Sequence, residues 1–253
     1  MTVLVTGGTG QIGRPLVQLL RSRDVPVVVA TRTPGPDAAL SRRLDLATGD
    51  GLPDVLDGVH AVVLLHTDPR RAREVDAEGT ARLARAAKAA GVQHLLLLSI
   101  VGCDRVPFGY YRAKVAAEKA VEESGVGWTV QRATQFHTVV RRIAGSLPAH
   151  GPVAVLPRGW GSQPVEPAAV VERLAELVSG RPSGRVDDLA GPQRISRAEA
   201  ARLVSKPRWL LQVPVPGRLG RSLADGGNLP RAGALIRGSS FTEWLAATTE
   251  VTA

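Results

Sequence analysis

The sequence predicts an α/β fold with a doubly wound parallel sheet, because apolar runs alternate with helical patterns over residues 1–134. Short apolar runs are typical of buried parallel strands, and apolar residues three and four apart are typical of amphipathic helices. A glycine-rich segment joins the first apolar run to the first helix. Elements that alternate in this way form right-handed crossovers around a single sheet.

The chain begins with a predicted strand at 3–5, and glycines spaced by three follow it. Such a turn lets a backbone approach a pyrophosphate, and the N-terminus of the next helix offers unpaired N–H groups and a positive dipole end. This context predicts a Rossmann-like dinucleotide site. The residues assigned to it are Thr6, Gly7, Thr9, Gly10, Gln11, Ile12 and Gly13.

The other elements follow from the same patterns. Strands are predicted at 25–32, near Leu44, and at 60–67, 93–99 and 127–134. Helices are predicted at 14–22, 51–59, 70–90, 110–124, 167–180, 196–204 and 241–249, with Ser196 and Glu199 as a capping box. Residues 33–45 are predicted as loop or short helix, and 151–165 as a Gly/Pro-rich loop. We expect a single domain, 1–253, in which about 151–253 supplies most of a small C-terminal substrate-binding cap.

Composition favours a globular protein outside membranes. The chain has 253 residues, 44% of them hydrophobic and 22% charged, and no apolar run approaches the roughly 20 residues that span a bilayer. The first residues lack the basic and apolar regions of a cleaved leader. A single cysteine, Cys103, allows no internal disulfide and suits a reducing compartment, so a cytoplasmic location is expected. No Cys/His cluster has metal-ligand spacing, so no metal is expected.

The net charge of +9 raises the question of nucleic-acid binding. The basic residues, however, are spread along the chain as 28 arginines and four lysines, without a long basic run. Aromatic residues that could stack on bases amount to 4%. Dedicated nucleic-acid binding is therefore not expected.

The end of the second strand predicts which dinucleotide binds. A site for NAD usually places an acid there, on the ribose 2′-hydroxyl, whereas residues 31–33 are Thr, Arg and Thr. A guanidinium can instead pair with a 2′-phosphate, so Arg32 favours NADP(H) over NAD(H). Arg14 is a second candidate for this contact. The alternative is that Arg32 is a solvated loop residue.

Tyr110 and Lys114 form a Tyr-x-x-x-Lys pair on a predicted helix. The i,i+4 spacing places both side chains on one helix face, so both can reach the same ligand. A nearby cation also favours the phenolate form of a tyrosine. The alternative is that Tyr110 only packs and Lys114 is solvated.

With these motifs the chain resembles the short-chain dehydrogenase/reductase superfamily, most closely its extended and atypical NmrA-like branch. The segments that carry the resemblance are TGGTGQIG at 6–13, DL at 45–46, DGVHAVV at 57–63, EGTARLARAAKAAGVQHLLLLS at 78–99, YYRAK at 110–114 and QRATQF at 131–136. The resemblance implies that Tyr110 is a general acid and that Lys114 holds the nicotinamide ribose. It also implies that Asp45 and Leu46 border the adenine.

The resemblance implies a third catalytic hydroxyl, for which Ser99 is the candidate. Extended members usually carry a run of hydroxyl residues here, whereas this chain continues with Ile, Val and Gly. Ser99 is therefore either catalytic or a contact to the cofactor or the turn. Further expected cofactor contacts are His66, Thr67 and Thr134. Expected substrate contacts are Tyr111, Phe136, His137, Trp160 and Gln163.

The sequence thus predicts an NADPH-dependent oxidoreductase that transfers hydride to a carbonyl or conjugated carbon of a small organic substrate. Two alternatives stay open. The protein could instead bind NADP(H) as a non-catalytic regulatory sensor. It could also be an epimerase, dehydratase or cyclase of the same superfamily. The sequence predicts neither the substrate nor the oligomeric state.

Overall fold

The chain divides into two compact units in a computed structural model that describes residues 1–35, 40–146 and 153–250. The first unit comprises Met1–Ser99, Gly109–Gln131 and Val170–Val186. The second comprises Ile100–Phe108, Arg132–Ala169 and Asp187–Ala253. The predicted cap segment 151–253 therefore contributes to both units, and its role in substrate binding stays a prediction.

The first unit is built on a parallel sheet with the strand order β3-β2-β1-β4-β5-β6. The strands are β1 (Val3–Thr6), β2 (Val27–Thr31), β3 (Ser41–Arg43), β4 (Ala61–Leu64), β5 (His94–Ile100) and β6 (Trp128–Ala133), with β9 (Gly184–Arg185) paired to β6. This order reverses direction next to β1, as in doubly wound dinucleotide-binding folds. The predicted fold class is confirmed.

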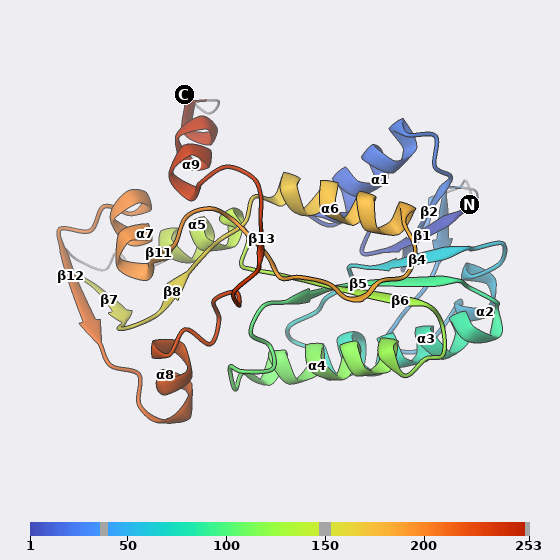
Figure 1. The fold of residues 1–253 in the computed structure, drawn as a ribbon, viewed down its shortest axis with the longest axis horizontal. Coiled ribbons are helices and arrows are strands. Elements are labelled where there is room, and N and C mark those ends of the chain that lie inside the picture. Colours follow the sequence, from blue (N-terminus) through green and yellow to red (C-terminus); the bar gives the residue numbers. More distant parts are fainter. Residues whose placement is uncertain (36–39, 147–152, 251–253) are drawn as a thin grey trace. The chain divides into compact units, whose positions relative to one another are not determined.

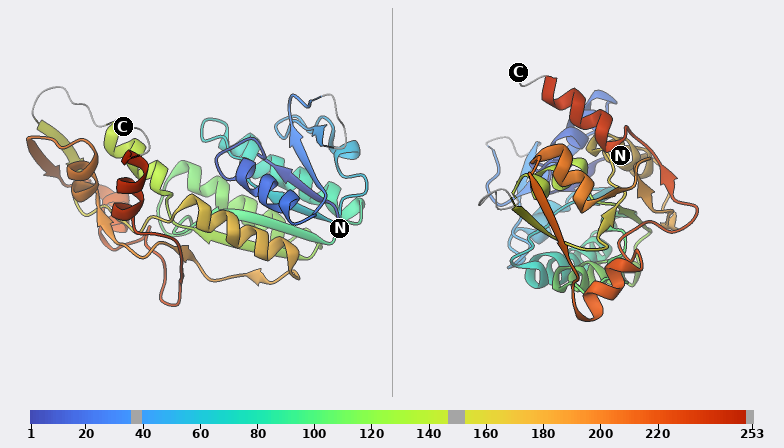
Figure 2. Two further views of the ribbon diagram at one scale, coloured as in Figure 1. Left: turned by 90° about the horizontal axis from the view of Figure 1, so that it is seen from above. Right: turned by 90° about the vertical axis from the view of Figure 1, so that its left-hand side faces the viewer.

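Helices cover both faces of this sheet (Figure 1). The helices α1 (Gly13–Ser22) and α6 (Pro167–Ser179) lie over one face, and α3 (Thr80–Ala89) and α4 (Gly109–Glu122) lie over the other. A short helix, α2 (Leu52–Val55), follows β3. Figure 2 shows α1 and α6 side by side, where Arg23 pairs with Glu172 at 2.7 Å. Because both faces are covered, β1, β4 and most of β5 are buried, as continuous apolar runs predict.

The predicted helix at 70–90 consists of two segments. A π-helix, η1 (Arg73–Gly79), precedes α3 directly. Gly79 lies so close to the loop after β3 that an added Cβ would be 2.8 Å from the Leu46 carbonyl oxygen. The alanine-rich pattern suits an α-helix and a π-helix equally, so only contacts with other elements decide where the wider π turn forms. Such π turns are frequent at functional sites.

The second unit combines short strands with helices. Its strands are β7 (Val153–Pro157), β8 (Gly161–Ser162), β10 (Leu189–Ala190), β11 (Ile195–Ser196), β12 (Trp209–Val213) and β13 (Leu235–Ile236). Its helices are α5 (His137–Gly145), α7 (Arg197–Val204), α8 (Gly217–Ala224) and α9 (Phe241–Glu250). In α7 the capping box of Ser196 and Glu199 is present as predicted.

Some expectations for loops were wrong or fall outside the described residues. The segment 151–165 contains β7 and β8, which pair with β12 and β11. Gly and Pro dominate its composition, so only the partner strands reveal it as sheet. Positions 36–39 and 151–152 of the predicted loops lie outside the described residues. Among the helices of the described part, none is long and apolar enough to cross a membrane.

Candidate cofactor and active site

A cavity of about 350 Å³ lies at the carboxyl ends of β1, β2 and β4 in the first unit. This is where a doubly wound sheet places its ligand crevice. Of the predicted cofactor residues, those lining it are Thr6, Gly7, Thr9, Gly10, Arg32, Asp45, Leu46, His66 and Thr67. Residues from four separate parts of the sequence therefore meet at one cavity.

The glycine turn forms one wall of the cavity and has the geometry that a pyrophosphate requires. Gly7 has a φ of +68°, and an added Cβ there would lie 2.9 Å from the Leu65 carbonyl carbon. A Cβ on Gly13 would collide with the Gly7 carbonyl oxygen. Among the described residues, no side chain caps the N-terminus of α1, which begins at Gly13. The turn is tight and leads directly into the N-terminus of α1, whose positive dipole end favours a phosphate. Within the first helical turn the Arg14 N–H already donates to the Gly10 carbonyl oxygen at 3.0 Å, and Pro15 has no N–H.

Arg32 lies just beyond β2 on the lining of the same cavity. Asp45 lies on the lining too, but its carboxylate accepts a hydrogen bond from the Ala47 N–H at 2.8 Å. Asp45 therefore shapes the loop after β3, and Arg32 supplies a positive charge to the cavity. These positions suit an adenosine that carries a 2′-phosphate.

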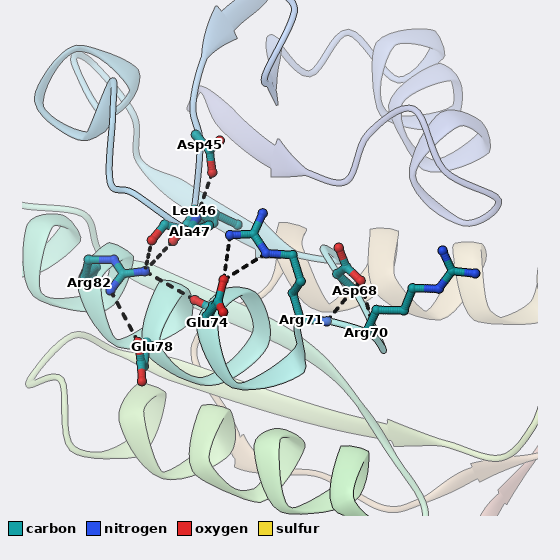
Figure 3. Close-up of polar contacts among 9 residues, drawn as sticks. All are labelled: Asp45, Leu46, Ala47, Asp68, Arg70, Arg71, Glu74, Glu78 and Arg82. Atoms are coloured by element: carbon teal, nitrogen blue, oxygen red, sulfur yellow. Dashed lines mark hydrogen bonds and ion pairs between the residues drawn. The ribbon is translucent and has the colours of Figure 1, made fainter.

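Two arginines that the sequence did not single out lie near this side of the cavity, and Figure 3 shows their contacts. Arg82 of α3 donates to the carbonyl oxygens of Leu46 and Ala47 at 2.7 and 2.8 Å, which fixes the loop. Arg71 lines the cavity and pairs through Nε and Nη2 with the Glu74 carboxylate at 2.8 and 2.5 Å. That carboxylate raises the pKa of Arg71 and compensates its charge.

His66 is partly buried just beyond the end of β4, between two threonine hydroxyls. Its Nδ1 lies 2.9 Å from the Thr6 Oγ1, and its Nε2 lies 3.0 Å from the Thr80 Oγ1. The pKa of His66 is lowered to about 3, first by burial and then by the positive charge of Lys114. The imidazole is therefore neutral at physiological pH and orients the segment that leads to Thr67.

Lys114 projects from α4 and forms an ion pair with Asp76 of η1, with 2.8 Å between Nζ and Oδ1. Both side chains are almost entirely buried, at 6% and 0% exposure. The Nζ atom also lies 5.7 Å from the centre of the Tyr110 ring. Lys114 is thus neither solvated nor isolated, and Asp76 compensates its charge.

Tyr110 lies half-buried at the start of α4, with its phenol oxygen 2.6 Å from the Thr67 Oγ1. Its ring contacts Tyr111, with 6.2 Å between the ring centres. Ser99 is buried in β5, at 3% exposure. The hydroxyl that the structure brings to Tyr110 is therefore that of Thr67, whereas a catalytic role for Ser99 stays a prediction.

Three other predicted site residues belong to the second unit. Thr134 is buried, and its backbone N–H donates to the Leu189 carbonyl. Phe136 bridges to Val165. His137 is fully buried, and its Nε2 donates to the Ser239 carbonyl at 3.0 Å. Burial also lowers the pKa of His137.

Trp160 and Gln163 are also held within the second unit. The Arg197 guanidinium lies 3.9 Å from the centre of the Trp160 ring. The Gln163 amide donates to the Gly191 carbonyl at 2.8 Å and accepts from Arg194 at 3.1 Å. The substrate roles assigned to these residues and to Tyr111 stay predictions.

Asp68, Arg71, Val75 and Asp76 follow Thr67 in the chain and were not predicted from the sequence. Three of them line the cavity, and Asp76 holds Lys114. One signal could have found the first two, because they closely follow the carboxyl end of a strand at the crevice. Asp76 gives no such signal, since only the packing of η1 against α4 brings it to Lys114.

Comparison with known proteins agrees with this geometry. A protein-family model described as NAD(P)H-binding matches residues 7–141. The (4-alkanoyl-5-oxo-2,5-dihydrofuran-3-yl)methyl phosphate reductase of Streptomyces griseus is 32% identical over 217 residues, which cover 81% of this chain and 73% of that protein. The NAD(P)H azoreductase of Xenophilus azovorans is 29% identical, over 80% of this chain and 72% of that protein.

Solved structures share the fold. The NADPH-dependent quinone oxidoreductase from Escherichia coli, complexed with NADPH, superposes with a TM-score of 0.77 at 21% identity, covering 98% of this chain and 99% of that one. The UDP-N-acetylglucosamine 4-epimerase from Bacillus cereus has a TM-score of 0.70 at 13% identity, covering 99% and 96%. At these identities the likeness concerns the fold alone, and reductases and an epimerase share it.

Proposed function

Because the chain belongs to the NAD(P)H-binding family, we propose that it is an NADPH-dependent reductase of small, electron-poor conjugated substrates. The observation that carries the proposal is the cavity at the glycine turn, where Arg32 and Thr67, the partner of Tyr110, lie on one lining. The turn would hold the pyrophosphate, and Arg32 the 2′-phosphate. When bound, the reduced nicotinamide supplies the hydride.

The relatives support the choice of substrate class. The Streptomyces griseus reductase is named for a furanone whose ring double bond is conjugated with carbonyl groups, and the Xenophilus azovorans enzyme is named for azo compounds. Another relative is named quinone oxidoreductase 2, from Escherichia coli, 29% identical over 51% of this chain and 47% of that protein. Each name denotes reduction of a conjugated, electron-poor π-system. A carbonyl or conjugated carbon is the proposed acceptor, as the furanone and the quinone in two of these names suggest.

Tyr110 is the proposed general acid. Its phenol oxygen is held by the Thr67 hydroxyl at 2.6 Å, and it donates its proton to the substrate oxygen as the hydride reaches carbon. Lys114, paired with Asp76, lies 5.7 Å from the centre of the Tyr110 ring, so both side chains can reach the same ligand. A proton donor positioned in this way contributes typically about 10²- to 10⁴-fold to rate.

The test measures oxidation of NADPH by absorbance against a panel of quinones, enones, ketones and azo dyes. We expect turnover with conjugated acceptors, and an about 10²- to 10⁴-fold lower kcat in Tyr110→Phe with unchanged NADPH affinity. Near-normal turnover in Tyr110→Phe rules out its role as the acid. Tight NADPH binding without oxidation across the panel supports the regulatory sensor instead.

A further inference from the structure

Asp76 and Lys114 are a buried ion pair whose members come from different elements of the first unit. The carboxylate belongs to the π-helix η1 and the ammonium to α4, with 2.8 Å between Oδ1 and Nζ. At 0% and 6% exposure, neither charge is solvated. A buried pair of this kind depends on its own geometry, because loss of one partner leaves the other charge uncompensated.

The Asp76 carboxylate is fixed from a second direction. Its Oδ2 accepts a hydrogen bond from the Asp68 N–H at 2.9 Å. The Asp68 carboxylate in turn accepts from the N–H groups of Arg70 and Arg71 at 3.1 and 3.3 Å, as Figure 3 shows. Since Asp68 and Arg71 line the cavity, Asp76 ties the cavity wall directly to the position of Lys114.

The neighbouring His66 does not compensate the lysine charge. Its ring is held by Thr6 and Thr80, and its pKa is lowered to about 3, first by burial and then by Lys114. A neutral imidazole therefore lies beside a charged ammonium, and Asp76 balances that charge.

We propose that Asp76 is a positioning residue, whose carboxylate holds the Lys114 ammonium in place before the dinucleotide binds. A lysine side chain has a flexible four-carbon stem, and its ordering by Asp76 in the free protein lowers the cost of ordering it on binding. An ammonium has three N–H donors, so Lys114 can donate to a ligand while its charge stays paired with Asp76. That Lys114 contacts the nicotinamide ribose of the bound dinucleotide rests on the proposed function.

The test compares the dissociation constants of NADPH and of 2′,5′-ADP, which lacks the nicotinamide ribose. In Asp76→Asn and in Lys114→Met we expect about tenfold weaker binding of NADPH and less than about a twofold change for 2′,5′-ADP. The double variant should bind NADPH no more weakly than Lys114→Met, because Asp76 acts through Lys114. The matched control is Glu118→Gln, which removes a buried carboxylate of α4 that faces Arg185 at 3.9 Å and should change neither constant.

A second measurement keeps the inference testable without any cofactor. The chain has four lysines, so lysine labelled with ¹³C at Cε gives four methylene signals, and Lys114→Met assigns one of them. In the free native protein we expect the two ε-protons of Lys114 to give separate resonances. In Asp76→Asn these two resonances should merge, while the signals of the other three lysines stay unchanged. Asp76→Glu retains the charge, so its ε-protons should be partly inequivalent and its NADPH affinity should lie between those of the native protein and Lys114→Met. This variant also tests the inference if Asp76→Asn does not fold.

Several outcomes would overturn the inference. One is that Asp76→Asn binds NADPH with the affinity of the native protein, while Lys114→Met binds NADPH weakly. Another is that Asp76→Asn binds NADPH and 2′,5′-ADP more weakly to the same extent, which indicates a disturbed fold. If the native protein binds no NADPH, the proposed function fails, and the NMR signals alone decide whether Asp76 positions Lys114.

Discussion

The hydroxyl groups of Thr67 and Tyr110 lie 2.6 Å apart, although the residues are 43 positions apart in the chain. Thr67 follows β4 and lines the cavity, and Tyr110 is in the first turn of α4. The contact brings the phenol to the cavity lining and restricts its orientation. The resemblance made Ser99, in β5, the candidate for the second hydroxyl, whereas the structure places the Thr67 hydroxyl, which follows β4, beside the tyrosine.

Thr67→Val should lower kcat about tenfold, since it removes the hydrogen bond to Tyr110 and retains the shape of the side chain. A hydrogen bond of this kind contributes about 0.5–1.5 kcal/mol, and about 1.4 kcal/mol corresponds to tenfold in rate. The measurement is steady-state turnover with the best acceptor of the panel. Thr67→Ser, which keeps the hydroxyl, should retain most of the activity, and equal losses in both variants would argue against a role for the hydroxyl.

Arg32→Ala should weaken NADPH binding about 10- to 100-fold and leave NADH binding within about twofold. Hydrogen bonds to charged groups contribute about 1.5–3 kcal/mol, and only NADPH carries the 2′-phosphate. Titration of both cofactors by fluorescence measures the two constants.

Arg71→Ala is the matched control, because Arg71 lines the same cavity but is already paired with Glu74. We expect its ratio of NADPH to NADH affinity to change less than about threefold. A change in that ratio as large as for Arg32→Ala would move the 2′-phosphate contact to Arg71.

The stability of the protein should fall at mildly acidic pH, partly because of His66. Its pKa is about 3 in the folded protein, against 6.5 for an unperturbed histidine, so the unfolded chain binds the proton first as the pH falls. Protonation between pH 6.5 and 3 therefore favours unfolding, and the loss from about pH 7 to pH 4.5 is about 2–3 kcal/mol.

Urea denaturation at several pH values measures this loss. His66→Gln retains hydrogen-bonding atoms but does not titrate, so its stability should depend less on pH over the same range. Carboxylates titrate in both proteins, and the difference between the two curves isolates His66. Parallel curves would show that His66 is not the group responsible.

Gly13→Ala should destabilise the protein by about 1–3 kcal/mol and weaken NADPH binding, because the added Cβ forces the turn to move. That Cβ would collide with the Gly7 carbonyl oxygen and lie 2.6 Å from the Gly8 Cα. Gly35→Ala is the control, since among the described residues its Cβ would meet only the Ser41 Oγ, at 3.7 Å. Urea denaturation should separate the two variants, and equal stability would contradict the close packing inferred for the turn.

Local patterns were sufficient for most elements of the first unit, although not for the π-helix η1 or for β9. Glycines at positions 7, 10 and 13 predicted the turn because few other residues fit there, and apolar runs predicted most of the strands because both faces of the sheet are covered. The capping box at Ser196 was equally local. The second unit gave weaker signals, since β7 and β12 are recognisable only by their pairing with each other.

By itself the sequence determined the doubly wound sheet and the glycine turn, and it predicted that Arg32 contacts a 2′-phosphate, because each depends on residues close together in the chain. Only the tertiary structure decided that Asp76 pairs with Lys114 and that Thr67 contacts Tyr110. These contacts join η1 and the end of β4 to α4, and no periodicity encodes them. The physical cause of the first contact is burial, which forces charged groups from separate elements to pair with one another. The second contact depends on the packing that places the start of α4 beside the segment after β4.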